Sequence, residues 1–221
     1  MVKKTNTTLI FDLDGTLLNT LEDLYRAVNE ALRMHGMPQH TLEEIRWMVG
    51  NGVKLLVERA VPKGTSAAEI EQVFSDFRTY YTAHSLDTTR PYEGITEMLA
   101  QLKGMGIPMA VVSNKMDAAT RSLVQQFFGE WIDVAIGDRE GWRRKPAPDM
   151  VFEAMQQLKA NPAHCIFVGD SDVDFLTAVN ANIPCLSVLW GFRDRKFLES
   201  HGATIFIEKP EEIVQYCSRL D

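Results

Sequence analysis

The sequence has little cysteine, no long hydrophobic run and no basic cluster, and each absence excludes a class of protein. Its three cysteines show no CxxC or histidine-linked spacing, so we expect reduced thiols rather than a disulfide framework or a zinc site. No apolar stretch has the length of a membrane span, and Asp12 interrupts the short one near the N-terminus that would otherwise resemble a signal peptide. These features predict a cytoplasmic protein with no membrane partner.

Charge and histidine distribution narrow the possibilities further. The chain of 221 residues has a formal net charge of -7 and no stripe of Lys and Arg, which argues against a nucleic-acid partner. Its five histidines are scattered, without the spacing of a catalytic triad or a metal site. The length suits one large or two modest domains, and it leaves monomer and homodimer both open.

Two patterns of apolar residues divide the chain. From about residue 18 to residue 84, apolar side chains recur at the three-to-four spacing of helices, and no convincing strand interrupts them. From Pro91 onward, short β-rich runs alternate with helical ones, which is typical of βαβ units. The strand candidates are Thr8 to Phe11, Pro108 to Ser113, Ile132 to Ile136, Cys165 to Gly169, Cys185 to Trp190 and Thr204 to Ile207.

These patterns predict an α/β fold with a Rossmann-like, mainly parallel sheet flanked by helices. Because the first strand precedes the all-helical block, the block is expected to be an insertion into the α/β domain. The predicted domains are residues 1–17 and 87–221 for the α/β core, and residues 18–86 for the helical insertion.

Two carboxylates, Asp12 and Asp14, stand at the end of the first predicted strand. The preceding run, Thr8 to Phe11, has the composition of a strand buried on both faces, and Gly15 permits a tight turn. Buried carboxylates need a cation, a phosphate or a shared proton, because burying an unpaired charge is costly. Taken alone, the pair is equally well explained as solvated acids beside an ordinary turn.

Other polar side chains follow the later strands, where ligands gather in an open parallel sheet. They are Ser113, Asn114 and Lys115, then Asp170, Asp172 and Asp174, with Lys145 before an intervening helix. Each has a plain alternative, as a helix cap, a helix N-terminal acid or a solvated cation. If a helix begins near Ser171, Asp170 and Asp174 lie about one turn apart on one side of it, and Asp172 points elsewhere. Together the set suits a divalent cation and a phosphoryl group.

The order of these residues resembles the haloacid dehalogenase-like hydrolase superfamily. Its four motifs correspond to Asp12-Leu13-Asp14-Gly15-Thr16, Ser113-Asn114, Lys145-Pro146-Ala147-Pro148 and Gly169-Asp170-Ser171-Asp172-Val173-Asp174. The inserted block looks like the helical cap of that family, because it lies between the first two motifs. Three stretches look most like the phosphoglycolate phosphatase branch: Val49-Gly50-Asn51-Gly52, Arg90-Pro91-Tyr92-Glu93-Gly94 and Val112-Ser113-Asn114-Lys115.

The resemblance implies a division of roles. Asp12 would be the nucleophile that forms an aspartyl-phosphate, and Asp14 the general acid and base. Mg²⁺ would be held by the Asp12 carboxylate, the main-chain carbonyl of Asp14 and Asp170. Family dehalogenases lack an acid at the position of Asp14, because a halide leaves without a proton, so its presence favours phosphate esters.

The remaining motif residues would serve the phosphate. Lys145 would neutralise the nucleophile and the phosphate oxygens, and Ser113 with the amide of Asn114 would bind the phosphoryl group. Asp174 would orient Lys145 or act as an outer ligand of the metal.

The predicted function is therefore hydrolysis of a small phosphomonoester, with 2-phosphoglycolate favoured. Inorganic pyrophosphatase, sugar-phosphate phosphatase and nucleotidase activities stay open, and a phosphorylatable receiver or binding protein is the alternative of another class. Substrate choice is expected to lie in the cap, where Asn51 and Lys54 are candidates, Lys54 being equally well explained as a solvent-facing cation.

Overall fold

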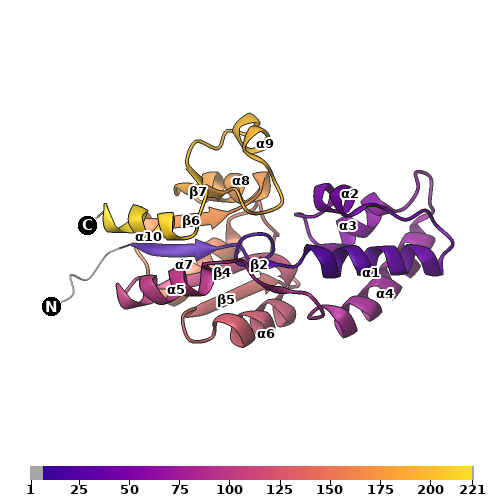
Figure 1. Ribbon diagram of the computed structural model, residues 1–221, viewed down its shortest axis with the longest axis horizontal. Helices are drawn as coiled ribbons and strands as arrows, with labels where there is room; N and C mark the ends of the chain where they lie inside the picture. Colours follow the sequence, from indigo (N-terminus) through magenta and orange to yellow (C-terminus); the bar gives the residue numbers. More distant parts are fainter. Residues whose placement is uncertain (1–6, 221) are drawn as a thin grey trace. The chain divides into compact units, whose positions relative to one another are not determined.

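The structure, a computed structural model, describes residues 7–220 and contains a six-stranded parallel sheet. The strands are β1 (Thr8–Phe11), β4 (Met109–Met116), β5 (Val134–Asp138), β6 (Cys165–Gly169), β7 (Cys185–Val188) and β8 (Phe206–Ile207). Their order across the sheet is β5-β4-β1-β6-β7-β8, so the first strand lies in the middle (Figure 1). All four residues of β1 are buried, as expected for a strand that is covered on both faces.

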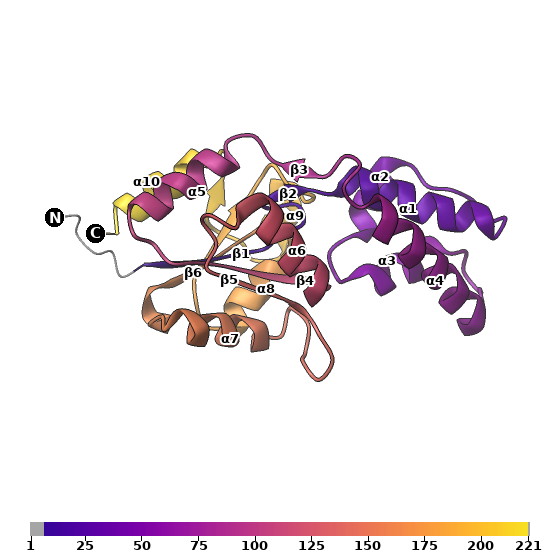
Figure 2. The ribbon, with the colours of Figure 1, turned by 90° about the horizontal axis from the view of Figure 1, so that it is seen from below.

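Helices cover both faces of this sheet. They are α5 (Ile95–Gly104), α6 (Asp117–Phe128), α7 (Asp149–Leu158), α8 (Asp172–Asn180), α9 (Arg195–Ser200) and α10 (Glu211–Ser218), with a 3₁₀ turn at Pro162–His164. Figure 2 shows α7 and α8 on one face, with α5, α6 and α10 on the other. Apolar side chains of α7 and α8 pack against Ile10, Val112 and Phe167, the centre of one half of the core. The predicted parallel sheet flanked by helices is confirmed.

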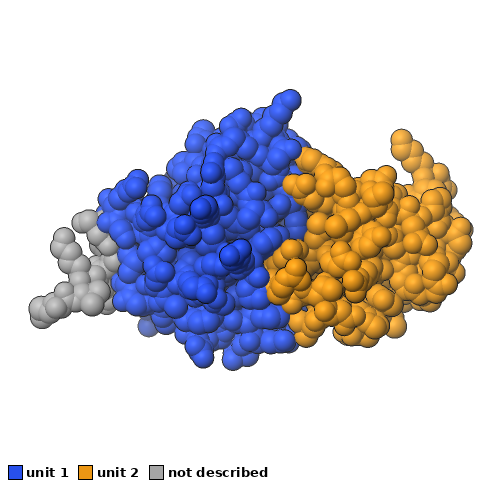
Figure 3. All heavy atoms as spheres, in the orientation of Figure 1, with its two compact units in different colours: residues 1–17, 91–221 blue, residues 18–90 orange. Residues whose placement is uncertain are grey.

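The chain divides into two compact units, coloured separately in Figure 3. The core unit consists of residues 1–17 and 91–221, and the helical unit of residues 18–90. The helical unit contains α1 (Leu21–Met34), α2 (Leu42–Met48), α3 (Val53–Ala60) and α4 (Ala67–His84). Its second boundary falls after Arg90, whereas the sequence pattern placed it after residue 86. No helix among residues 7–220 is long and apolar enough to cross a membrane.

Strand bounds differ from the sequence expectation where backbone geometry changes. β1 and β6 have the predicted bounds. β4 continues to Met116, because its register against β5 shifts after Val112 and the two strands pair again where Met116 meets Asp138. Ser113 and Asn114 therefore lie within the strand, at its irregular segment, rather than after it. Two short strands, β2 (Leu18–Asn19) and β3 (Arg90–Pro91), were not expected, since two residues show no alternation.

A buried carboxylate, Asp23, ties the two ends of the helical unit together. Its oxygens accept hydrogen bonds from the backbone and hydroxyl groups of Thr88 and Thr89, over distances of 2.6 to 3.1 Å. Burial alone would raise the pKa of Asp23, but these hydrogen bonds outweigh it and hold the pKa below its ordinary value. This contact explains why the unit extends past residue 86.

We predict that Asp23→Asn lowers the free energy of unfolding by about 2 to 4 kcal/mol at pH 7, because an amide offers one acceptor oxygen where the carboxylate offers two. The contribution of a carboxylate with a lowered pKa is present above its unfolded pKa of about 3.9 and disappears as pH falls through the folded value. The difference between wild type and variant should therefore shrink from pH 7 to pH 3 in urea unfolding curves.

The control for this measurement is Glu22→Gln on the same helix, where an exposed carboxylate pairs with Arg26. We expect a change below about 0.5 kcal/mol there. A difference between wild type and Asp23→Asn that stayed constant down to pH 3 would contradict the assigned role of the carboxylate.

Candidate active site

The site begins where β1 ends in the middle of the sheet. The backbone N–H of Asp12 still donates to the carbonyl of Val168 at 2.9 Å, so β6 holds Asp12 in register. The chain then turns at Gly15, whose φ of +87° lies in the left-handed region that favours glycine. Asp12 is thus fixed by the sheet, and Asp14 stands on the turn.

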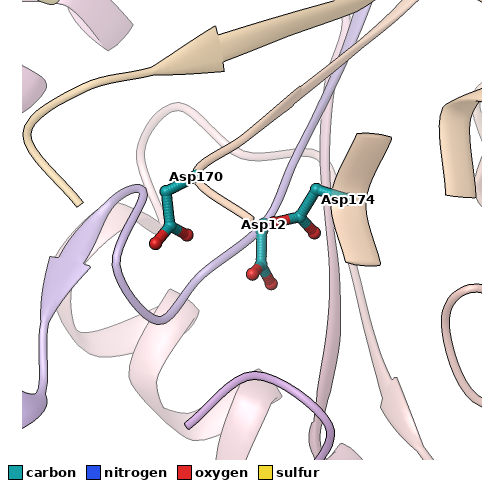
Figure 4. Close-up of side chains that lie close together, drawn as sticks. All are labelled: Asp12, Asp170 and Asp174. Atoms are coloured by element: carbon teal, nitrogen blue, oxygen red, sulfur yellow. The ribbon is translucent and has the colours of Figure 1, made fainter. Parts of the chain in front are cut away.

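Three carboxylates from separate elements meet at this point. Asp12 follows β1, Asp170 follows β6, and Asp174 lies in the first turn of α8; Figure 4 shows their side chains side by side. One carboxylate oxygen of each lies within 4.8 Å of the others. All three residues are buried, so their charges repel one another at low dielectric. The cluster needs positive charge.

Lys145 supplies part of that charge. Its Nζ lies 2.8 Å from Oδ1 of Asp12 and 2.7 Å from Oδ1 of Asp174, and its side chain is 1 % exposed. Burial by itself lowers the pKa of a lysine, but Asp12 and Asp174 more than offset this and raise the pKa of Lys145. Lys145 therefore stays protonated.

Asp174 also closes the N-terminus of α8. Its Oδ2 accepts from the backbone N–H and the hydroxyl of Ser171 at 3.1 and 2.6 Å, while the Ser171 hydroxyl accepts from the Asp174 N–H. This capping box, together with Lys145 on Oδ1, engages both carboxylate oxygens of Asp174. Asp174 is therefore better placed to orient Lys145 than to contact a ligand. Asp172, the next acid, is only half-buried and is not part of the cluster.

Asp170 is held against the backbone. Its Oδ1 accepts from the hydroxyl of Thr16 at 3.1 Å, and its Oδ2 accepts from the N–H of Phe192 at 2.7 Å. A Cβ on Gly15 would lie 2.5 Å from Oδ2 of Asp170, and a Cβ on Gly191 would overlap the Asp170 side chain. The carboxylate thus fits only because two neighbouring residues have no side chain.

Burial is the main cause of the raised pKa values of Asp12 and Asp170. It raises the pKa of Asp12 well above its ordinary value, with a further rise from Asp174, although Lys145 acts in the opposite direction. Burial likewise raises the pKa of Asp170 to about 7, again with a rise from Asp174. One ammonium group in contact with this cluster is therefore too little positive charge for three carboxylates.

A metal ion fits this arrangement. Oδ1 of Asp12 is buried and receives no well-directed hydrogen bond from residues 7–220, although Nζ of Lys145 lies 2.8 Å away. Each oxygen of Asp170 has accepted one hydrogen bond and keeps a further lone pair. Carboxylate oxygens are ligands for hard divalent cations, so the cluster can bind a metal ion.

The residues of β4 support Lys145 and add polar groups. The side-chain amide of Asn114 pairs with the backbone of Lys145 in both directions: Oδ1 accepts from its N–H at 2.8 Å, and Nδ2 donates to its carbonyl at 3.1 Å. The Ser113 hydroxyl is buried and accepts from the N–H of Lys115 at 3.3 Å. The side chain of Asn114 therefore positions Lys145.

Asp14 has a partner that the motifs did not assign. Nζ of Lys115 lies 3.2 Å from both carboxylate oxygens of Asp14. The lysine side chain is 4 % exposed and that of Asp14 is 18 % exposed. The sequence signal was present, since Lys115 directly follows Ser113-Asn114, but spacing along the chain did not show which carboxylate it meets.

The two candidates for substrate choice, Asn51 and Lys54, both lie in the helical unit. Oδ1 of Asn51 accepts from Arg59 at 2.9 Å, and Lys54 forms an ion pair with Glu71. Both residues contact other side chains of their own unit, and their assignment to substrate choice stays a prediction.

Fold and site define an α/β enzyme with a buried acidic cluster, able to bind a metal ion, at the carboxyl edge of a parallel sheet. The family model of the haloacid dehalogenase-like hydrolases matches residues 9–188, and the chain belongs to this family, as its motifs predicted.

Individual relatives are consistent with this family membership. A phosphoglycolate phosphatase of Pseudomonas putida is 31% identical, over 95% of this chain and 79% of its own. An N-acetylmuramic acid 6-phosphate phosphatase of Pseudomonas aeruginosa is 29% identical, over 96% of this chain and 94% of its own. A crystal structure from Lactobacillus delbrueckii subsp. bulgaricus, provisionally assigned as a phosphoglycolate phosphatase, superposes with a TM-score of 0.92 at 33% identity, covering 96% and 98%.

We predict that Gly191→Ala destabilises the protein by about 1 to 3 kcal/mol, because the new methyl group would overlap Asp170 and the carbonyl of Gly15. The matched control is Gly104→Ala at the end of α5, where a methyl group meets nothing within 4 Å. Denaturant unfolding of both variants tests this. Equal stability of the two variants would show that the backbone around Asp170 yields easily.

Proposed function

We propose that this protein is a Mg²⁺-dependent phosphatase of a small-molecule phosphomonoester, with 2-phosphoglycolate as the favoured substrate. The observation that supports it most directly is the pairing of the Asp12 carboxylate with Lys145 beside Asp170, with a second carboxylate, Asp14, two residues further on. A nucleophile, a cation site and a proton carrier are thus available within one unit.

In the proposed first step, a carboxylate oxygen of Asp12 attacks phosphorus in line while the bond from phosphorus to the ester oxygen breaks. Asp14 donates its proton to the departing alkoxide. In the second step, Asp14 accepts a proton from water as that water attacks phosphorus and the bond between the Asp12 oxygen and phosphorus breaks. This step releases inorganic phosphate and restores the Asp12 carboxylate. Lys145 stays charged throughout and balances negative charge on the nucleophile and the phosphoryl oxygens.

We propose that Mg²⁺ is held by the Asp12 carboxylate, the main-chain carbonyl of Asp14 and Asp170. When bound, the ion supplies positive charge that lowers the pKa of both carboxylates and screens the phosphoryl group. Asp174 takes no direct part in this assignment. Its Oδ2 accepts two hydrogen bonds from Ser171 and its Oδ1 accepts one from Lys145, whereas each oxygen of Asp170 accepts only one. Ser113 and the backbone N–H of Asn114 are assigned to the phosphoryl oxygens.

The favoured substrate is supported by the names of relatives rather than by a contact in this chain. The relative from Pseudomonas putida is named for phosphoglycolate, while the one from Pseudomonas aeruginosa is named for a sugar phosphate at nearly equal identity. A sugar phosphate is therefore the second candidate. Selection between them is assigned to the helical unit, with Asn51 and Lys54 as the proposed residues.

We further propose that the protein acts in the cytoplasm, as a monomer or homodimer. Three buried free cysteines support a reducing compartment, since none forms a disulfide.

The proposed function is tested by measuring phosphate release from a panel containing 2-phosphoglycolate, N-acetylmuramic acid 6-phosphate, other sugar phosphates, nucleotides and pyrophosphate. We expect turnover with Mg²⁺ and none with a chelator. Asp12→Asn should lower the rate by at least about 10³-fold, because the nucleophile is lost.

The matched control is Asp172→Asn, which alters a nearby acid outside the cluster and should keep the wild-type rate within about twofold. A stable stoichiometric phosphoenzyme without turnover would instead favour the receiver alternative. Turnover by Asp12→Asn near the wild-type rate would exclude Asp12 as the nucleophile.

We also predict that Asp14→Asn slows hydrolysis of alkyl phosphates by about 10² to 10⁴-fold, because their leaving alkoxide needs a proton. Formation of the phosphoenzyme from p-nitrophenyl phosphate should be much less affected, since p-nitrophenolate leaves without one. Single-turnover and steady-state rates on the two substrates provide the measurement. Equal losses in the single-turnover rate of phosphoenzyme formation from both substrates would remove Asp14 from the role of acid.

A further inference from the structure

The strongest unassigned feature of the core unit is the buried lysine beside Asp14. Lys115 is almost completely buried, and its ammonium group is equidistant, at 3.2 Å, from the two oxygens of one carboxylate. A buried ammonium group is retained only where it is well paired, because its desolvation is costly. The contact with Asp14 is therefore a built feature of the fold, unlike a surface ion pair.

The backbone that delivers Lys115 is itself specialised. The register of β4 shifts between Val112 and Met116, and such irregularities re-aim side chains beside functional sites. The carbonyl of Lys115 accepts from the buried hydroxyl of Thr120 at 3.2 Å. A Cβ on Gly137 would lie 2.6 Å from that same carbonyl, so β5 passes directly against it. Lys115 is thus held at both its main chain and its side chain.

The two buried lysines have different partners. Lys145 contacts Asp12 and Asp174, whereas Lys115 contacts Asp14. The side chain of Asp14 stands on a tight turn and is 18 % exposed, against 12 % for Asp12. A donor at equal distance from both oxygens limits the rotation of the Asp14 side chain.

We propose that Lys115 is a positioning residue that orients the carboxylate of Asp14 toward the oxygen of the leaving group. This inference rests on the proposed function, in which Asp14 carries the proton. As the ester bond to phosphorus breaks and the bond from Asp12 to phosphorus forms, the proton passes from one Asp14 oxygen to the departing alkoxide. Lys115 contacts both oxygens of this carboxylate and fixes its orientation, and it exchanges no proton with the substrate.

The test compares Lys115→Met, which keeps the length of the side chain but removes the charge, with Lys115→Arg, which keeps the charge. For an alkyl phosphate, Lys115→Met should lower kcat by about 10²-fold with KM changed less than about threefold, because a misoriented acid weakens the transition state alone. Phosphoenzyme formation from p-nitrophenyl phosphate should change less than about threefold. Lys115→Arg should recover most of the alkyl phosphate rate.

Two comparisons separate positioning from a general loss of structure. In an Asp14→Asn background, adding Lys115→Met should cost less than about twofold, because the group on which it acts is already gone. Lys103→Met removes an exposed lysine that pairs with Asp133 and should leave both rates unchanged. Multiplicative losses in the double variant, equal losses on both substrates, or a raised KM with unchanged kcat would overturn the proposal.

A readout independent of activity is the crystal structure of Lys115→Met. We expect the Asp14 carboxylate to occupy more than one rotamer there and a single rotamer in Lys115→Arg. One unchanged rotamer in Lys115→Met overturns the inference even if the enzyme is a phosphatase. A wild type that releases no phosphate from any substrate refutes the proposed function and the proton-transfer role with it, whereas the rotamers still decide whether Lys115 orients Asp14.

Discussion

The interaction on which the site depends is the buried ammonium group of Lys145 between Asp12 and Asp174. Without it, three carboxylates would be buried against one another, and at low dielectric such repulsion would protonate them or open the structure. The same lysine is anchored through its backbone by the Asn114 side chain, so the contact joins β1, β4 and α8, which are far apart in the sequence. An Asp12 carboxylate that can be ionised and a correctly assembled sheet edge are therefore consequences of one contact.

Electrostatic attraction alone does not explain the geometry of the carboxylate cluster, because the backbone also limits where the carboxylates can lie. Gly169 lies against the side chain of Asp174, while Gly15 and Gly191 lie against Asp170. A methyl group at any of these positions would collide with a carboxylate. Since the cluster is packed this tightly, the carboxylates cannot separate to relieve their repulsion. A bound cation would relieve this repulsion, so the same packing that compresses the acids also favours metal binding.

Much of the fold followed from sequence because local patterns and tertiary structure agree. The continuous apolar run of Thr8 to Phe11 became the central strand β1, and the spacing of Asp170 and Asp174 across an N-terminal turn placed both in one cluster. What sequence could not show depends on register and on partners distant in the chain. The register shift in β4 put Ser113 and Asn114 inside a strand, and it aimed Lys115 at a carboxylate 101 residues earlier. The contact between Asp23 and Thr88 is similarly long-range and moved the domain boundary.

The two aspartates of the first motif differ because their lysines differ. Asp12 shares Lys145 with Asp174 inside a cluster where burial raises the pKa of Asp12. Asp14 stands on the turn beside Lys115 and has a more exposed side chain. A nucleophile benefits from being dry and fixed, since water would compete with its attack on phosphorus. A proton carrier needs contact with a leaving group and with water in turn. One carboxylate on the sheet and the next on a glycine turn suit the two proposed roles within three residues. Two separate lysines keep each carboxylate in its own electrostatic environment.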